Sequence, residues 1–174
     1  MKLFMVVVGG DCQTSNVELH DVRFCVGARI EDCHGELHRQ WWGDPASLHL
    51  DGYSEVTQAD GFDISLEPGD PAPSDPRLYF VNLGGYVPGL FGEAHENVLI
   101  VADSPAAAKA KALARAPDWR EPHKDQLFEL DKALDVSAQL GRLGLRLVLR
   151  AAKTIRAPEI VLGYVPIGHL AGQG

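Results

Sequence analysis

One stretch of this chain occurs twice. Residues 3–28 align with residues 78–103 without a gap, and seven of the 26 aligned positions are identical. Further along, the pattern His-x-Asp-x-x-x-Glu at residues 49–55 returns at residues 123–129. Internal similarity at a fixed spacing is typical of a supersecondary unit used twice, so we interpret the chain as two tandem halves.

A proline-rich segment lies between the halves. Residues 67–77 contain four prolines, which restrict the backbone and remove hydrogen-bond donors, so this segment is predicted to be an extended linker. The predicted organisation is a first repeat, a linker, a second repeat and a C-terminal tail with one further candidate strand, over residues 1–66, 67–77, 78–150 and 151–174.

The apolar periodicity of the first repeat changes along its length. The predicted elements are a strand at 3–8, a strand at 18–26, a helix at 30–42 and strands at 53–58 and 62–66. Gly9-Gly10 is predicted to be a turn that ends the first strand. Alternation along the second strand places Cys25 on its outward side, opposite Phe24.

The second repeat shows the same order. The predicted elements are strands at 78–83 and 97–102, a helix from Pro105 to Ala116, and further elements near 126–132 and 145–149. Ser104 before Pro105 is a typical helix N-cap. Residues 145–149 fit a strand or a helix, and the apolar run 160–166 is the candidate tail strand. The predicted fold is α+β, with two β-β-α-β-β-like repeats packed together about a pseudo-twofold axis.

The charge and the cysteine content of the chain indicate which kinds of partner and environment it has. The net charge of −8 disfavours nucleic acid, which is bound through basic side chains. Three cysteines without a Cys-x-x-Cys spacing, and an N-terminal apolar run of only six residues, indicate a soluble cytoplasmic protein without a membrane segment. Residues 1–76 carry 14 acidic and four basic side chains, whereas residues 77–174 carry 10 and 12. This asymmetry is compatible with a homo-oligomer or with a solvated basic face.

Two polar pairs occur in both repeats. They are Glu-x-His and His-x-Asp, and in extended backbone each pair presents an imidazole and a carboxylate on one face. The candidate site residues are Glu18, His20, His49, Asp51, Glu93, His95, His123 and Asp125. If the pairs of one repeat converge, they form a ligand set for a divalent metal such as zinc, manganese or iron, or a histidine oriented for proton transfer.

A structural role is the alternative for these pairs. The histidines and acids would then tie turns to neighbouring strands through bonds to the backbone. His34 and His38 are four residues apart in the predicted first helix, a spacing that also suits a metal, but the second repeat has Lys109 and Leu113 there. A solvated helix face explains this histidine pair better.

Several longer strings resemble one protein family. They are Gly9-Gly10-Asp11, residues 15–24, Arg39-Gln40-Trp41-Trp42-Gly43, Leu48-His49-Leu50-Asp51 and residues 79–86. Together they are similar to a bacterial family called domain of unknown function 1543, whose members carry the domain once or twice. The resemblance covers most of residues 1–130. It implies a bacterial cytoplasmic protein and assigns no reaction.

Two functions fit the sequence. The first is a non-enzymatic binding or interaction module that associates with itself. The second is a metal-assisted or acid-base hydrolase that uses the repeated Glu-x-His and His-x-Asp pairs.

Overall fold

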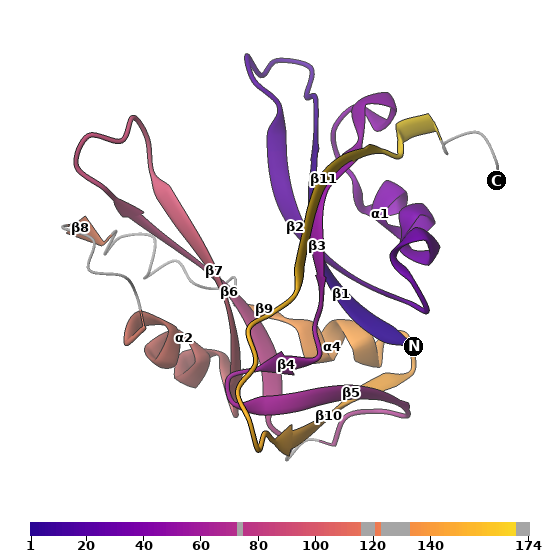
Figure 1. The fold of residues 1–174 in the computed structure, drawn as a ribbon, viewed down its shortest axis with the longest axis vertical. Coiled ribbons are helices and arrows are strands. Elements are labelled where there is room, and N and C mark those ends of the chain that lie inside the picture. The colour runs from indigo at the N-terminus through magenta and orange to yellow at the C-terminus, as the bar shows by residue number, and fades with distance from the viewer. Residues whose placement is uncertain (73–74, 116–120, 123–132, 170–174) are drawn as a thin grey trace. The chain divides into compact units, whose positions relative to one another are not determined.

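The computed structural model describes residues 1–72, 75–115, 121–122 and 133–169 (Figure 1). The chain divides into two compact units. Unit 1 consists of residues 1–58 and 153–174, and unit 2 consists of residues 59–152. The described strands form three small antiparallel sheets and the helices are few, so the fold is α+β, as predicted.

Unit 1 is built on a four-stranded antiparallel sheet. Its strands are β1 (Lys2–Gly10), β2 (Leu19–Gly27), β3 (His49–Glu55) and β11 (Ile160–Pro166), in the order β11-β3-β1-β2. The central strand β1 therefore pairs with β2 on one side and with β3 on the other. The tail segment 160–166 supplies the edge strand β11, which pairs with β3.

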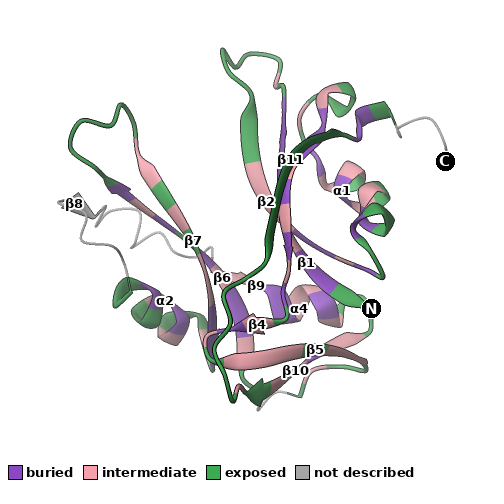
Figure 2. Cartoon of the chain, in the orientation of Figure 1, coloured by how far each residue is buried: buried purple, intermediate pink, exposed green. Residues whose placement is uncertain are grey.

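Short helices pack on one face of this sheet. They are the 3-10 helix η1 (Ile30–Cys33), the helix α1 (His34–Gln40) and the 3-10 helix η2 (Pro45–Ser47). The predicted helix at 30–42 thus begins as a 3-10 turn and ends at Gln40. The core between helices and sheet includes Phe4, Val6, Val8, Cys25, Cys33, Leu37, Trp41, Leu48 and Leu50. These residues alternate along the strands, as a sheet buried on one face requires (Figure 2).

The prediction for Cys25 was wrong. Its side chain is only 3% exposed and lies in the core beside Cys33, because η1 and α1 cover that face of β2. A hydrogen bond with the Cys33 thiol, together with burial, raises the pKa of the Cys25 thiol. Alternation along the strand was predicted correctly, but the sequence did not show which face the helix would cover.

The prediction for Gly9-Gly10 was also wrong. Both glycines lie inside β1, where Gly9 pairs with His20 and with His49, and Gly10 pairs with Leu19. They do not form a turn. Glycine inside a strand often marks a place where other groups approach the backbone closely.

The strands of unit 2 form two sheets. One sheet has the order β10-β5-β4, and in the other β6 pairs with β7, β8 and β9. The bounds are β4 (Gln58–Ala59), β5 (Phe62–Pro68), β6 (Arg77–Tyr86), β7 (Ala94–Ala102), β8 (Glu121–Pro122), β9 (Leu134–Asp135) and β10 (Leu145–Ala151). Residues 145–149, for which the sequence left strand and helix open, are a strand because β10 pairs with β5 along its whole length.

Two helices complete unit 2. The helix α2 (Pro105–Leu113) begins as predicted, since the Ser104 side chain accepts a hydrogen bond from the backbone N–H of Ala107. The helix α4 (Val136–Gly141) is capped in the same way by Asp135. No helix within the described residues is long and apolar enough to cross a membrane.

The units follow a different division from the predicted repeats. Residues 62–66, predicted as the last strand of the first repeat, lie in β5, which pairs with β10 in unit 2. The place of that strand in the sheet of unit 1 is taken by β11 from the tail. The predicted element at 126–132 lies outside the described residues.

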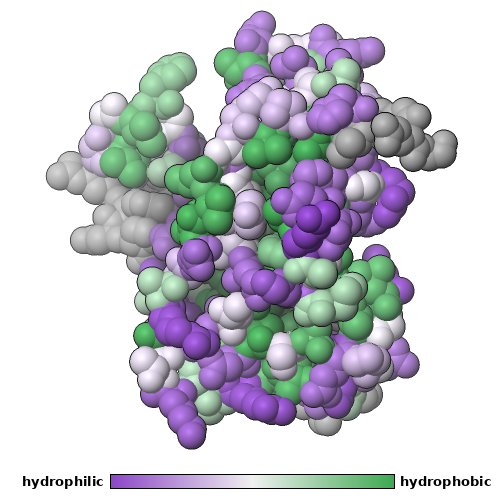
Figure 3. Space-filling model, turned by 45° about the vertical axis from the view of Figure 1, so that its right-hand side comes forward, coloured by the Kyte–Doolittle hydropathy of each residue, from purple (hydrophilic) through white to green (hydrophobic). Residues whose placement is uncertain are grey.

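The edge strand β11 is exposed along its whole length (Figure 2). It carries several large apolar side chains, among them Ile160, Leu162 and Tyr164. Apolar side chains also reach the surface elsewhere, where they lie among hydrophilic ones (Figure 3). Single exposed apolar residues are normal on a protein surface, so exposure alone does not mark an interface.

Candidate metal centre

Two histidines flank Gly9 in the sheet of unit 1. Within the antiparallel pairs, Gly9 lies opposite His20 of β2 and opposite His49 of β3. Residues paired across neighbouring strands place their side chains on the same face of a sheet. Strand pairing thus brings together two imidazoles that are 29 positions apart in the sequence.

A β-bulge brings in the first carboxylate. The pairing of β1 with β3 shifts between Val7 and Val8, because Gly52 and Leu50 are their partners and Asp51 is the extra residue between them. The carboxylate Oδ2 of Asp51 lies 3.1 Å from Nε2 of His20, and Oδ1 lies 3.5 Å from Nε2 of His49.

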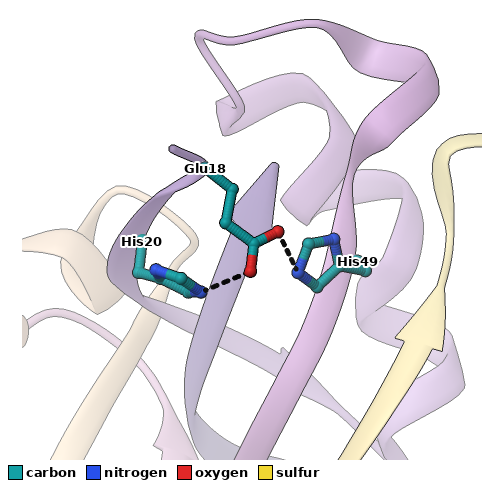
Figure 4. Close-up of side chains that lie close together, drawn as sticks. All are labelled: Glu18, His20 and His49. Carbon is teal, nitrogen blue, oxygen red and sulfur yellow. Dashed lines mark ion pairs between the residues drawn. The ribbon is translucent and has the colours of Figure 1, made fainter. Parts of the chain in front are cut away.

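The second carboxylate comes from the connection that leads into β2. Glu18 immediately precedes this strand and places Oε1 3.4 Å from Nε2 of His20 and Oε2 3.5 Å from Nε2 of His49. In Figure 4 its carboxylate lies between the two imidazoles. Each acid therefore contacts both histidines, and we refer to Glu18, His20, His49 and Asp51 as the unit 1 cluster.

The tautomer of His49 follows from its surroundings. Its Nδ1 lies 2.9 Å from the backbone carbonyl oxygen of Ser47. A carbonyl oxygen can only accept, so Nδ1 donates, and in the neutral ring the lone pair is on Nε2. This bond holds the ring with Nε2 directed at the two carboxylates.

That arrangement leaves buried polar atoms without hydrogen-bond partners among the described residues. The His49 side chain is only 2% exposed, and within the described residues neither its Nε2 nor Oδ2 of Asp51 makes a hydrogen bond. Buried polar groups without a partner are costly. A lone pair facing carboxylates needs either a proton or a cation between them.

Gly9 provides the room for the cluster. A Cβ atom at this position would lie 2.7 Å from Nε2 of His49, 2.8 Å from Cδ2 of His20 and 3.0 Å from Oδ2 of Asp51. Real Cβ atoms essentially never come within less than 3.0 Å of another atom, so the rings of His49 and His20 would both have to shift. Glycine is therefore required where the imidazoles and the carboxylate converge.

Tyr164 of β11 covers part of His49. The two ring centroids are 4.3 Å apart with an angle of 34° between the ring planes. Tyr164 remains 66% exposed, and Glu18 and His20 have side chains 46% and 47% exposed. The cluster thus has a buried side at His49 and a solvent side at Glu18 and His20.

Unit 2 contains the equivalent hairpin. In it Gly84 pairs with His95, in the same register as Gly9 with His20, and Nε2 of His95 lies 3.5 Å from Oε2 of Glu93. The other ring nitrogen of His95 lies 2.9 Å from Oδ1 of Asn82. The predicted partners His123 and Asp125 lie outside the described residues.

The predicted pairs of unit 1 converge. Each of the two acids contacts both histidines, and within the described part of the chain the one group of three donors close enough to share a metal ion is Glu18, His20 and His49. His34 and His38 on α1 are half-buried and belong to no such group. Burial lowers the pKa of His34. The sequence prediction did not include Gly9 or Ser47 as supporting residues.

The comparisons with known proteins identify a family. Residues 15–66, which contain the whole unit 1 cluster, match a Domain of Unknown Function, DUF1543. The chain belongs to the DUF1543 family. The matched range is shorter than the predicted one, which was most of residues 1–130.

The fold of the chain also occurs in a solved structure. The chain is similar to the crystal structure of a protein Il1583 from Idiomarina loihiensis, with 31% sequence identity and a TM-score of 0.69. The match covers 95% of this chain and 97% of that chain. No curated protein matches the chain.

Proposed function

We propose that unit 1 binds a divalent transition metal, and zinc in particular, through Glu18, His20, His49 and Asp51. The observation that carries this proposal is the buried Nε2 of His49, which makes no hydrogen bond within the described residues and faces two carboxylates. A cation between these atoms would compensate all of them. The Nδ1 bond to the carbonyl of Ser47 is the outer contact that commonly orients a metal-binding histidine.

The spacing of the donor atoms supports zinc. Zinc bonds to histidine and carboxylate are roughly 2.0 to 2.2 Å, so the edges of a tetrahedral site are about 3.4 Å long. The four histidine-to-carboxylate distances in the cluster are 3.1, 3.4, 3.5 and 3.5 Å. Both acids thus lie within reach of both histidines, and one donor atom each of Glu18, His20 and His49 lie within 4.8 Å of one another, close enough to share one ion.

The chemistry of the donors disfavours other common cations. Magnesium and calcium prefer sites made of oxygen atoms, whereas half of the donors here are imidazole nitrogens. Manganese and iron favour a larger number of ligands than the four side chains of the cluster supply, so the size of the donor set favours zinc.

We further propose that the hairpin β6–β7 of unit 2 belongs to a second divalent-metal site. What supports this is the shared hairpin register of Gly9 with His20 and of Gly84 with His95. The His-x-Asp pattern also returns at His123. Tandem duplication, a pseudo-twofold arrangement, self-association and a bacterial cytoplasmic location remain predictions from the sequence.

Metal analysis of the full chain, produced without a histidine tag, tests the proposal. The protein is dialysed against zinc, and bound metal is measured by mass spectrometry and by calorimetric titration. We expect His49→Ala and Asp51→Asn each to remove one equivalent of zinc. His38→Ala, on α1 outside the cluster, is the matched control and should leave the stoichiometry unchanged.

Two results would overturn the proposal. One is wild-type protein that binds no zinc. The other is a full complement of zinc in both His49→Ala and Asp51→Asn. Asp51→Asn preserves side-chain volume, so it separates loss of a ligand from loss of folding, which circular dichroism monitors in every variant.

A further inference from the structure

Unit 1 contains a cavity of about 350 Å³, which is large enough for a small organic molecule. Its floor consists of residues from three neighbouring strands, namely Phe4 of β1, Tyr53 of β3 and Val161 of β11. Residues 28–31, which lead from β2 into η1, form a wall. Because Gly9 follows Phe4 by an odd number of residues in β1, the cavity and the unit 1 cluster lie on opposite faces of the sheet.

The bottom of the cavity is aromatic. Phe4 is 4% exposed, and its ring centroid lies 6.1 Å from that of Tyr53, with an angle of 78° between the ring planes. Strand pairing places Val161 opposite Tyr53, and Ile30 of η1 adds a second aliphatic side chain. These side chains offer an apolar surface to a bound molecule, and aromatic rings also attract a cation that lies over their faces.

Charged side chains also line the cavity, and most of them are paired. Lys2 lies 2.7 Å from a carboxylate oxygen of Glu55, and Arg29 lies 3.7 Å from one of Glu31. The third acid of the lining, Glu159, is exposed and makes no ion pair or hydrogen bond within the described residues. One negative charge of the lining is therefore left without a partner.

This unpaired carboxylate approaches the cavity beside a second one. Glu159 immediately precedes Ile160, the first paired residue of β11, whose partner in β3 is Ser54, and Glu55 follows Ser54. Like charges on neighbouring strands repel one another, and the ammonium group of Lys2 pairs with Glu55. A second cation at this end of the cavity would compensate the charge of Glu159.

We propose that this cavity binds a small primary amine with an aromatic or aliphatic body. The ammonium group pairs with the Glu159 carboxylate, and the body packs on Tyr53 and Phe4. Hydrogen bonds between an ammonium group and a carboxylate are strengthened by charge, and burial of the body removes apolar surface from water. The site lies apart from the unit 1 cluster, so the proposal does not depend on a bound metal.

Three probes of similar shape and different charge test the ligand class. They are phenethylamine, phenethyl alcohol and phenylacetate, which at neutral pH are a cation, a neutral molecule and an anion. Each is titrated into the metal-free full chain, and binding is measured by calorimetry. We expect the amine to bind about 10-fold more tightly than the alcohol, and phenylacetate to bind most weakly.

A variant of Glu159 tests the residue that carries the charge. Glu159→Gln keeps the side-chain volume and removes the charge, so we expect the affinity for phenethylamine to fall about 10-fold and that for the alcohol to stay unchanged. Because Glu159 is exposed, this variant should fold, which circular dichroism checks. Glu36→Gln, at an acid of α1 that does not line the cavity, is the matched control and should bind all three probes as the wild type does.

A variant of the floor tests the apolar contact separately. Tyr53→Leu replaces the aromatic ring by an aliphatic side chain, and we expect it to weaken binding of the amine and of the alcohol alike.

Four results would overturn the proposal. They are wild-type protein that does not bind phenethylamine, equal affinity for the amine and the alcohol, tighter binding of phenylacetate, and unchanged affinity for the amine in Glu159→Gln. None of them bears on the zinc site, whose test uses other variants.

Discussion

Within the described residues, the hairpins β1–β2 and β6–β7 have the same register but different neighbours. In unit 1 a third strand, β3, runs along β1 and supplies His49 and Asp51 to the glycine and histidine of the hairpin. In unit 2 the corresponding histidine, His95, contacts Asn82 of its own hairpin, at the position that Val7 occupies in unit 1. In unit 1 the hairpin β1–β2 and the residue before β2 provide His20 and Glu18, and β3 adds a second histidine and a second acid.

The corresponding histidine of unit 2, His95, and the additional histidine of unit 1, His49, differ in exposure and in their contacts. The side chain of His95 is 49% exposed, and within the described residues it contacts Asn82 of β6 and Glu93, which immediately precedes β7. His49 is almost fully buried and is oriented by a backbone carbonyl. Burial and orientation, rather than the Glu-x-His motif alone, leave Nε2 of His49 without a hydrogen bond within the described residues.

Replacing His49 or His95 by alanine in separate variants should produce the largest difference between the two units. We expect His49→Ala to weaken zinc binding by more than about 100-fold and to reduce the free energy of unfolding by about 2 kcal/mol, because it empties a buried position. His95→Ala, at a half-exposed position, should reduce the free energy of unfolding by less than about 1 kcal/mol. Calorimetric titration and urea unfolding measure both effects. Equal effects of the two variants would show that the units do not differ as described.

Chelation should affect stability through the unit 1 cluster. A ligand at a free concentration 100 times its dissociation constant stabilises the folded state by about 2.7 kcal/mol. EDTA should therefore lower the melting temperature of zinc-loaded wild-type protein, and it should have a much smaller effect on Asp51→Asn. Scanning calorimetry measures the difference. An equal decrease in both proteins would place the stabilising metal elsewhere.

The two glycines should respond differently to the same substitution. A Cβ at Gly9 meets three side chains, so Gly9→Ala should cost about 1 to 3 kcal/mol of stability. A Cβ at Gly84 meets the end of the Glu93 side chain, which can rotate away, and His95 at 3.6 Å. Gly84→Ala should therefore cost less than about 1 kcal/mol. Urea unfolding of both variants measures the two losses. A larger loss of stability in Gly84→Ala than in Gly9→Ala would contradict the predicted difference between the glycines.

The smallest effect on stability is expected at the cross-strand pair Asn82–Asn97 of unit 2, whose counterpart in unit 1 is Val7–Val22. Asn82 contacts both His95 and Asn97 on an exposed part of the hairpin. Asn82→Val, which introduces the unit 1 residue, should change the free energy of unfolding by no more than about 0.5 kcal/mol. Thermal unfolding measures the change. A large loss of stability would mean that this polar contact holds the unit 2 hairpin together.

Much of the local structure could be predicted from the sequence. The strands that become β1, β2, β6 and β7 were found from apolar runs and alternation, and the start of α2 from Ser104 and Pro105. Errors arose where local pattern and tertiary contact disagree. Gly9-Gly10 has the composition of a turn, and only the side chains crowding over it explain why it lies inside a strand.

Non-local pairing was harder to predict. Residues 62–66 alternate clearly, but alternation does not say which strand will be the neighbour, and β5 pairs with β10 rather than joining the sheet of unit 1. The edge strand β11 returns from the far end of the chain to take that place. Strand partners distant in sequence are selected by packing and register, which short-range patterns do not encode.

The sequence by itself determined which donors were present, since the Glu-x-His and His-x-Asp pairs give two imidazoles and two carboxylates, each pair on one face of an extended chain. Only the tertiary structure decided that they meet. Antiparallel pairing places His20 and His49 on either side of Gly9, and a bulge turns Asp51 toward both. The physical reason is that the reach of a side chain is a few ångströms, so donors 29 positions apart form a site only when the strands between them are in register.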